Sequence, residues 1–345
     1  MILTPSDLPY RPISQAYQMR FGARVYKVPV SVADDCPNRK GLRGMETCSF
    51  CDVWGSAAHS ESLSMKLADQ IKLYRENIRR KFKAAKFLIY FQAYTTTFTK
   101  IQELREAFEL AVNDDDVVGF VIGTRPDCLS KSVIDLWQEF HERKFVAVEV
   151  GVQSFNAFHL EFMRRGHTAE QSLKAIERIA RETDVDLGIH LILGCPREPD
   201  SEIIRMAEIC NSLPITNVKL HNLHVLKQTK LETWYRDGLF EPVELEEYSR
   251  RVEVLLQHLS PRIFVHRLAA YASRREELVA PEWVAHKMKS HQAIVQYLRS
   301  RGSYQSQRFQ AESPLDQALQ RDLAMKTGSG TSGLTAPLQT LSLSL

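Results

Sequence analysis

The sequence predicts an α/β fold: a partial (β/α)6 TIM-type barrel with a basic, mainly helical C-terminal extension and a flexible tail. Six near-continuous apolar runs rich in β-branched residues carry this prediction, because parallel strands covered on both faces have this pattern. Amphipathic segments separate the runs, whose starts lie mostly about 30–40 residues apart, the length of a βαβ unit. The alternative, an open doubly wound sheet, is disfavoured because no G-x-G-x-x-G or Walker loop follows any run.

The expected elements alternate along the first part of the chain. The strands are expected at residues 25–32, 86–92, 117–122, 145–152, 187–193 and 217–225. The helices are expected at 65–82, 100–112, 131–143, 169–182, 201–213 and 244–259. In a barrel of this kind the active-site residues lie at the C-terminal ends of the strands.

Composition divides the chain into three parts. Residues 1–260 form the expected barrel core, which includes a cysteine-containing loop at 33–55. Residues 261–310 form the expected basic extension, since nine Lys and Arg face three Glu between 262 and 309, a net charge of +6. From 311 to 345 the chain becomes rich in Ser, Thr and Gly, which predicts a disordered tail.

The overall composition excludes several classes of protein. Hydrophobic residues make up 44% of the 345 residues, which is enough for a large core and excludes a disordered or collagen-like chain. Lys and Arg number 45 against 42 Asp and Glu, and this net charge of +3 indicates no partner by itself. No apolar run approaches the roughly 18 residues of a membrane span, and residues 1–17 lack the pattern of a signal peptide. We therefore expect a cytoplasmic protein without a membrane partner.

Three of the six cysteines lie in one polar loop after the first expected strand. Cys36, Cys48 and Cys51 follow the spacing C-x11-C-x2-C. Three alternatives are open: a zinc site completed by His59, unrelated buried thiols, or a [4Fe–4S] cluster with three protein ligands. The cluster is favoured because three ligands leave one iron open, as a catalytic metal site requires. The other cysteines have apolar neighbours and are expected to pack in the core: Cys128, Cys195 and Cys210.

A three-cysteine loop after the first strand of a βα barrel resembles the radical S-adenosylmethionine (SAM) superfamily. The long first gap between the cysteines is similar to the subgroup of the Elongator catalytic subunit. Over residues 10–308, further blocks in the same order resemble the YhcC/YtqA-type bacterial family of that subgroup, among them YFQAYTTTF, VEVGVQS, RRGHT and KLHNLHVLKQT. The resemblance implies a [4Fe–4S] cluster whose open iron binds SAM, reductive cleavage of SAM to a 5′-deoxyadenosyl radical, and a reductant such as flavodoxin or ferredoxin.

Polar residues at the expected strand ends are candidates for binding SAM. The resemblance implies that Gln153 contacts the ribose, that Arg165 clamps the SAM carboxylate and that Gly194 allows close approach of adenine. Their structural alternatives are an interior polar network for Gln153, a surface salt bridge for Arg165 and a turn for Gly194. The second block lacks the Glu of the Gly-Gly-Glu turn found in many relatives, so the group that binds the SAM amine stays open. Gln92 and Thr95 of that block could supply side-chain acceptors for the amine, and Thr124 lies at the end of the third expected strand. The last candidates are Glu149, with an interior polar network as the alternative, and His190, with a satisfied core histidine as the alternative.

Candidates for contacting the substrate lie near the end of the sixth expected strand, in the basic extension, and at Tyr94 of the second block. Interleaved cations and aromatics are typical of RNA-binding surfaces, with an ordinary charged helical cap as the alternative. The candidates are Tyr94, Lys219, His221, His224, Arg267, Arg274 and Arg275.

The resemblance to the Elongator subgroup implies an enzyme that acts on tRNA, at the side chain of a wobble uridine. The first alternative is a radical SAM enzyme that acts on a small metabolite or a tetrapyrrole intermediate. The second alternative, from another class, is a zinc-stabilised RNA-binding protein without catalysis. The sequence leaves the catalytic residue and the oligomeric state open.

Overall fold

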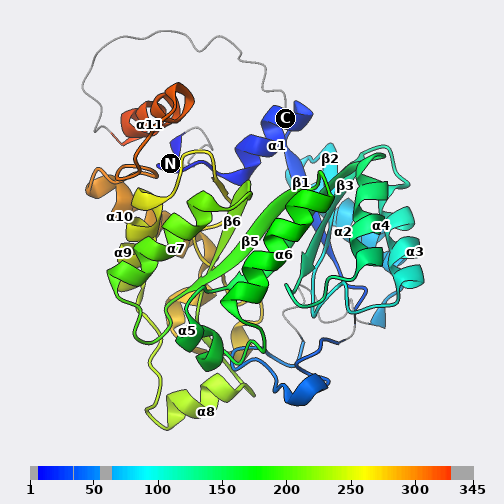
Figure 1. The fold of residues 1–345 in the computed structure, drawn as a ribbon, viewed down its shortest axis with the longest axis horizontal. Helices are drawn as coiled ribbons and strands as arrows, with labels where there is room; N and C mark the ends of the chain where they lie inside the picture. The colour runs from blue at the N-terminus through cyan, green and yellow to red at the C-terminus, as the bar shows by residue number, and fades with distance from the viewer. Residues whose placement is uncertain (1–6, 34, 55–63, 328–345) are drawn as a thin grey trace.

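Seven parallel strands form the framework of the computed structural model, which describes residues 7–33, 35–54 and 64–327 (Figure 1). The strands follow one another in chain order across the sheet, and the sheet curls into a half-barrel. Their bounds are β1 (Val25–Val30), β2 (Lys86–Phe91), β3 (Val117–Thr124), β4 (Phe145–Gln153), β5 (Asp186–Leu193), β6 (Asn217–Asn222) and β8 (Phe264–Val265). The partial barrel expected from the apolar runs is confirmed.

The end of the sheet differs from the expectation in two ways. The last expected strand, 217–225, is divided, because β6 ends at Asn222 and β7 (Val225–Leu226) pairs antiparallel with β9 (Leu278–Ala280) outside the main sheet. The seventh strand, β8, was not predicted. It has only two residues, which pair with Asn217 and Val218 of β6, and so short a segment carries no hydrophobic pattern.

The structure contains the helices α1 to α11, and several of them cover the outer face of the half-barrel (Figure 1). Their bounds are α1 (Ile13–Phe21), α2 (Leu67–Phe82), α3 (Ile101–Val112), α4 (Lys131–His141), α5 (Ala157–Phe162), α6 (Ala169–Glu182), α7 (Asp200–Ser212), α8 (Lys230–Arg236), α9 (Leu245–His258), α10 (Lys287–Ser300) and α11 (Pro314–Lys326). Side-chain caps fix several helix starts: at α6, Thr168 and Gln171 form a capping box, which satisfies backbone N–H groups that have no partner inside the helix.

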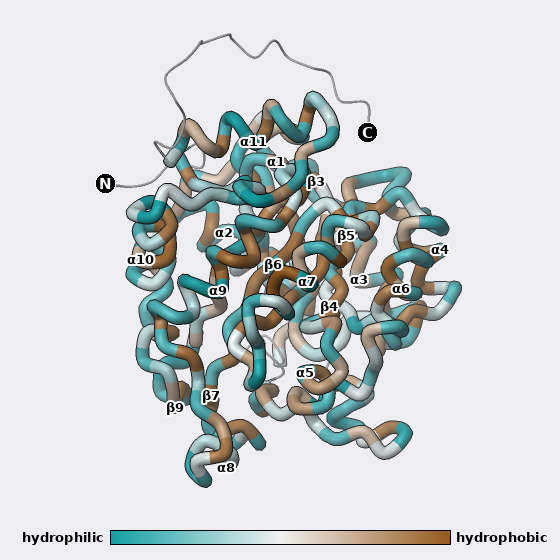
Figure 2. The backbone as a smooth tube through the Cα atoms, turned by 60° about the vertical axis from the view of Figure 1, so that its left-hand side comes forward, coloured by the Kyte–Doolittle hydropathy of each residue, from teal (hydrophilic) through white to brown (hydrophobic). Residues whose placement is uncertain are grey.

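The two faces of the sheet bury different side chains, since successive residues of a strand point to opposite sides. On β2, Ile89 and Phe91 belong to the large core under the outer helices. Leu88 points inward, where it packs in one cluster with Tyr17 of α1 and Phe145 at the start of β4. α1 therefore closes the inside of the half-barrel at the N-terminal ends of the strands. Figure 2 shows the hydrophobic residues gathered on the central strands.

The C-terminal part corrects one expectation. Residues 314–326 form the helix α11 rather than the disordered tail predicted from residue 311. The helix is capped by Ser313, buries Leu323 and is tied to the segment before β8 by Arg262, whose Nε donates to Asp316 Oδ1 at 2.5 Å. The Ser, Thr and Gly bias that suggested a tail begins only at Thr327, and residues 328–345 lie outside the described residues. None of the helices in the described ranges is long and apolar enough to cross a membrane.

Candidate metal and cofactor site

A cavity of about 680 Å³ opens at the C-terminal ends of the strands. This volume lies within the range of small-molecule sites, roughly 300–1,000 Å³. Its wall runs from the cysteine loop across the ends of β2 to β6 and on to the segment after β8. Most of the site residues predicted from the sequence line it: Cys36, Cys48, Cys51, Gln92, Tyr94, Thr95, Thr124, Gln153, Arg165, His190, Lys219, His221, His224, Arg267 and Arg274.

The cysteine loop is held against the turn that follows α5. The backbone N–H of Ser49, next to Cys48, donates to the carbonyl oxygen of Met163 at 3.1 Å. Asn38 Nδ2 donates to the carbonyl oxygen of Arg164 at 2.7 Å. The loop is therefore anchored near Cys36 by Asn38 and near Cys48 by Ser49. The positions of these thiols depend on the turn at the end of α5.

The three thiols line the same cavity but do not form the close group of ligand atoms seen at a preformed zinc site. Cys36 and Cys48 are buried. Burial raises the pKa of Cys51, and negative charge on Cys48, Asp52 and Cys36 raises it further. Zinc–sulfur bonds of about 2.3 Å place tetrahedral sulfur ligands about 3.8 Å apart. Among the residues that the structure describes, these Sγ atoms do not all lie within 4.8 Å of one another. Three thiolates fit the protein ligand set of a [4Fe–4S] cluster with one open iron, and His59, the expected fourth ligand of the zinc alternative, lies outside the described residues.

Arg165 reaches the thiols from the turn after α5. Its NH1 donates to Cys48 Sγ at 3.2 Å and its NH2 to the carbonyl oxygen of Gly151 at 3.0 Å, while its buried Nε has no hydrogen-bond partner in the described part of the chain. The next residue, Gly166, has a φ of 70°, and a Cβ there would lie 2.4 Å from Met45 Sδ in the cysteine loop. Glycine thus permits the close approach that brings the guanidinium to the thiols.

The ends of β3 and β4 supply the neighbouring wall. Arg125 donates to both carboxylate oxygens of Asp127, at 2.8 and 3.0 Å, and to the carbonyl oxygen of Arg165 at 2.7 Å. Gln153 follows an irregularity in the pairing of β4 with β5 and has a φ of 69°. Such an irregularity changes the direction of a side chain at the end of a strand, and here Gln153 lines the cavity.

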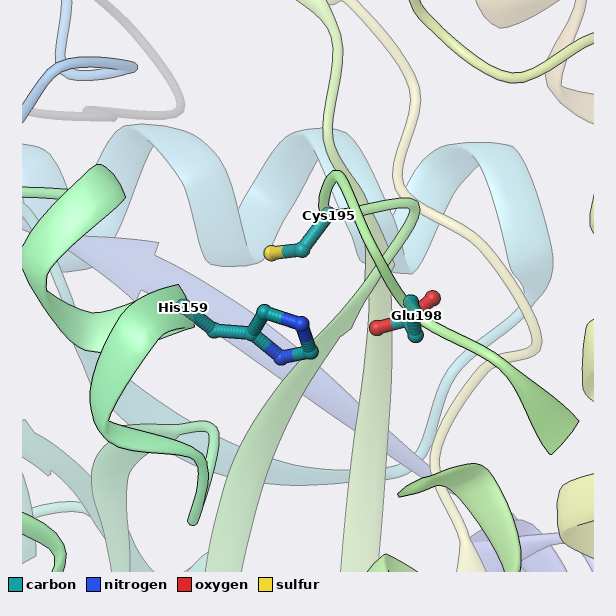
Figure 3. A group of neighbouring side chains, drawn as sticks. All are labelled: His159, Cys195 and Glu198. Carbon is teal, nitrogen blue, oxygen red and sulfur yellow. The ribbon is translucent and has the colours of Figure 1, made fainter. Parts of the chain in front are cut away.

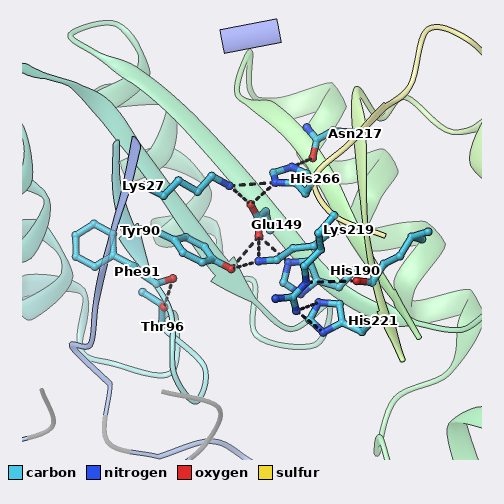
Figure 4. A network of polar contacts seen from close by, with 12 residues as sticks. Lys27, Tyr90, Phe91, Thr96, Glu149, His190, Asn217, Lys219, His221 and His266 are labelled. Atoms are coloured by element: carbon cyan, nitrogen blue, oxygen red, sulfur yellow. Dashed lines mark hydrogen bonds and ion pairs between the residues drawn. The ribbon is translucent and has the colours of Figure 1, made fainter. Parts of the chain in front are cut away.

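Inside the half-barrel, polar side chains surround the buried carboxylate of Glu149 (Figure 4). Glu149 Oε1 lies 2.6 Å from Lys27 Nζ. Glu149 Oε2 lies 2.7 Å from His190 Nε2 and 2.9 Å from Lys219 Nζ, and it accepts from the hydroxyl of Tyr90 at 2.9 Å. We call this set the Glu149 cluster, whose members are Lys27, Tyr90, Glu149, His190, Lys219 and His266.

Glu149 is the only carboxylate among the members of this cluster, and it contacts two lysines and two histidines. Burial and these charges shift the pKa values of the groups in the cluster. Burial alone would raise the pKa of Glu149, but Lys219 and Lys27 outweigh burial and hold it well below its usual range. Burial lowers the pKa of Lys219 to about 7 against the opposing charge of Glu149. Burial and Lys219 together lower the pKa of His190 to about 4, so its imidazole is neutral at pH 7.

The side of the cavity that faces the C-terminal segment carries cations and imidazoles. Arg267 NH2 lies 2.8 Å from His221 Nδ1, and burial together with Arg267 holds the pKa of His221 well below its usual range. Arg274 is ion-paired with Asp52 of the cysteine loop and, at 2.8 Å, with Glu277. This wall therefore presents guanidinium donors beside imidazoles and the carboxylates of Asp52 and Glu277.

Comparison with known proteins now gives the family. Residues 30–210 match the family model of the radical SAM superfamily, and residues 215–300 match that of the radical SAM C-terminal domain. The uncharacterized protein YtqA of Bacillus subtilis is 32% identical to this chain over 87% of the chain and 93% of its own length. The chain belongs to the radical SAM superfamily. The superfamily and the YtqA-type family inferred from the sequence are confirmed, and radical SAM proteins are generally enzymes that bind a [4Fe–4S] cluster and SAM.

Two further similarities concern the Elongator subgroup of radical SAM proteins. The archaeal Methanocaldococcus infernus Elp3, with an N-terminal deletion, superposes with a TM-score of 0.61 over 81% of this chain and 64% of that chain. At 16% identity this likeness shows the fold alone. A tRNA uridine(34) acetyltransferase of Methanocaldococcus jannaschii is 28% identical over 38% of this chain and 24% of its own length.

Three predicted residues of this radical SAM chain do not line the cavity: Glu149, Gly194 and Arg275. Glu149 has protein partners on both oxygens. The N–H of Gly194 donates to Glu198 at 2.8 Å, in the loop between β5 and α7. A role for these three residues in binding SAM or substrate stays a prediction.

The sequence reasoning did not include three members of the Glu149 cluster among the site residues. Lys27 lies in the first apolar run and Tyr90 in the second, and His266 follows β8 directly. A polar residue in an otherwise apolar run was the available signal, and it singled out only Glu149, Gln153 and His190.

Proposed function

We propose that this chain holds a [4Fe–4S] cluster on Cys36, Cys48 and Cys51 and binds SAM in the adjoining cavity. When bound, the cluster supplies the electron for reductive cleavage of SAM, and the 5′-deoxyadenosyl radical so formed takes a hydrogen atom from the substrate. The observation that carries the proposal is the set of three thiols at the rim of a 680 Å³ cavity that continues into the half-barrel.

Residues of this chain account for the binding tasks that such chemistry requires. Arg165 stabilises negative charge on Cys48 through NH1, and because it also lines the cavity its guanidinium is placed to bind a carboxylate such as that of SAM. Gln153 presents a side-chain amide to the same cavity, as a ribose hydroxyl would need. Because α1 closes the half-barrel at the N-terminal ends of the strands, substrate enters at the C-terminal ends. Closure on one side limits the access of water to the radical.

Replacement of one cysteine tests the cluster. We expect Cys48→Ser to lose the [4Fe–4S] absorption after anaerobic reconstitution and to form no 5′-deoxyadenosine from SAM and dithionite, since a hydroxyl is a poor ligand of iron in such clusters. Iron and sulfide analysis, with chromatography of the nucleosides, measures both losses. The matched control is Cys128→Ser, which changes a half-buried thiol outside the cysteine loop and should keep both properties. Formation of 5′-deoxyadenosine by Cys48→Ser would contradict the proposal.

We further propose a uridine of tRNA as the substrate. The cavity wall formed by Lys219, Arg267 and neutral imidazoles supplies donors for the carbonyl oxygens of a uracil base. A base must leave its stack to enter such a cavity. The partial similarity to a tRNA uridine(34) acetyltransferase supports the same class of substrate. A protein reductant such as flavodoxin or ferredoxin would deliver the electron.

Cells without this protein test the substrate. We expect one modified uridine to be missing from the nucleosides of their total tRNA, measured by liquid chromatography and mass spectrometry. Expression of the Cys128→Ser chain should restore that nucleoside, whereas the Cys48→Ser chain should not. An unchanged profile would overturn the tRNA proposal and favour a small metabolite or a tetrapyrrole intermediate, while the cluster experiment stands by itself.

A further inference from the structure

A second group of metal-ligand types lies where α5 meets the loop between β5 and α7 (Figure 3). Ligand atoms of His159, Cys195 and Glu198 all lie within 4.8 Å of one another. In Figure 3 the imidazole from α5 lies between the sulfur and the carboxylate. The three residues are only 1%, 2% and 5% exposed, so water does not solvate them.

Two of these ligand atoms lack a hydrogen-bond partner. Within the described ranges, neither His159 Nε2 nor Glu198 Oε1 has one, although both are buried. A buried polar atom without a partner costs about 1–3 kcal/mol, and two such atoms at one place require an explanation. The occupant that satisfies a nitrogen, an oxygen and a sulfur together is a metal cation, which accepts an electron pair from each.

The other polar atoms of the same side chains are held by neighbours. Glu198 Oε2 accepts from the N–H of Gly194 and from Arg251 NH1, both at 2.8 Å. His159 Nδ1 lies 3.2 Å from Ser154 Oγ. When Nδ1 carries the proton and donates it to Ser154, Nε2 presents its lone pair to Cys195 and Glu198. Partners of this kind orient the ligands of metal sites.

The backbone of the loop is also shaped to bring its two ligands together. Gly194 has a φ of 99° and Arg197 a φ of 53°, so left-handed residues lie on both sides of Cys195. A non-glycine residue in this conformation persists where the surrounding structure holds it. Here the guanidinium of Arg197 stacks over the ring of Phe158 on α5, 5.0 Å from its centroid.

We propose that His159 Nε2, Cys195 Sγ and Glu198 Oε1 bind one zinc ion, with a water or a backbone carbonyl as the fourth ligand. Mixed nitrogen, sulfur and oxygen donors are typical of zinc, whereas calcium and magnesium take oxygen ligands. Binding releases the thiol proton to solvent, and the resulting thiolate and the carboxylate, which also pairs with Arg251, offset most of the positive charge at the site. The deep burial of the site indicates a structural role.

Such a zinc ion would stabilise the cysteine loop indirectly. It would tie α5 to the loop between β5 and α7, and the turn after α5 accepts the hydrogen bonds of Ser49 and Asn38. Arg165 lies in the same turn and donates to Cys48. The inference does not depend on the proposed function, because the zinc ligands and the cysteine loop are different residues.

Metal analysis of the full chain tests the site. We expect one zinc ion per chain in protein produced with zinc and reconstituted with iron and sulfide, and we expect its loss in Cys195→Ala and in His159→Gln. Protein loaded with cobalt(II) instead should show a thiolate-to-cobalt charge-transfer band, and Cys195→Ala should abolish this band. The matched control, Cys128→Ser, should keep both the zinc and the band.

A second comparison separates this site from zinc that binds at the cysteine loop. A chain with Cys36, Cys48 and Cys51 all changed to Ser should still hold its zinc ion. Loss of zinc from that chain together with its retention in Cys195→Ala would overturn the inference, as would wild-type protein that holds no zinc. If the variants fail to fold, the wild-type chain still decides: a chelator should lower its melting temperature, and added zinc should restore it.

Discussion

At Glu149, burial and charge pairing act on the same carboxylate in opposite directions. The carboxylate is 2% exposed, and its removal from water disfavours the ionised form. Lys27 and Lys219, at 2.6 and 2.9 Å, reverse this effect and keep Glu149 ionised. The ion pairs of Glu149 with Lys27 and Lys219 are not independent of each other. Without the carboxylate, both lysines would be largely buried charges with no compensating partner in the cluster. Glu149 thus holds together side chains from several strands of the half-barrel.

The variant Glu149→Gln is expected to lower the free energy of unfolding by about 3–5 kcal/mol at pH 7, the cost of removing one partner from a buried ion pair. The difference from wild type should shrink in acid. An unfolded Glu titrates near pH 4.3, whereas the pKa of folded Glu149 lies well below this. Between the two values unfolding takes up a proton, so the contribution of Glu149 is complete above about pH 4.3 and falls as the pH falls.

Urea denaturation of both proteins at pH 7, 4 and 3 measures this difference. The control is Glu139→Gln, which removes a carboxylate paired with Arg105 on the exposed surface and should leave the unfolding midpoint unchanged. A loss in Glu149→Gln that is equally large at every pH would show that the amide disturbs packing and that the charge itself contributes little.

Single elements show what the sequence can and cannot predict. Each of the six apolar runs forms a strand, because burial on both faces is recorded in the residues of the strand itself. β8 has two residues and is a strand only because it pairs with β6. Its formation depends on a tertiary contact, which the local sequence does not reveal. The helix α11 was hidden by the biased composition of the residues that follow it, although Ser313 and Pro314 are an ordinary helix start.

The same distinction applies to the candidate site. Cys36, Cys48 and Cys51 could be predicted together because their spacing within one loop carries the information. The Glu149 cluster could not be predicted as a unit, since Lys27 and His266 lie 239 residues apart and meet only in the folded half-barrel. The group of His159, Cys195 and Glu198 was missed for a similar reason. Cys195 has the apolar neighbours of a packed core cysteine, and only the structure shows what its sulfur faces.

At the scale of the whole molecule, the C-terminal segment is packed into the same core as the barrel. Trp283, Val295 and Leu298 belong to one continuous cluster of buried side chains with residues of β2 and β4. β8 extends the sheet from the same segment, and the family match at 215–300 crosses residue 260. The packing favours a single cooperative unit, whereas the sequence predicted a boundary at 260, which stays a prediction until unfolding tests it.

Leu298→Ala distinguishes these two possibilities. Leu298 is fully buried on α10, and its truncation is expected to cost about 2–5 kcal/mol of unfolding free energy. In one cooperative unit the slowest-exchanging amides of β2, far away in sequence, lose the same protection as those of α10, because both exchange through global unfolding. Hydrogen exchange followed by mass spectrometry measures both segments in one experiment. Leu239→Ala, at a side chain that is 70% exposed, is the control and should change neither. Faster exchange in α10 with unchanged exchange in β2 would instead establish residues 261–310 as a separately unfolding extension.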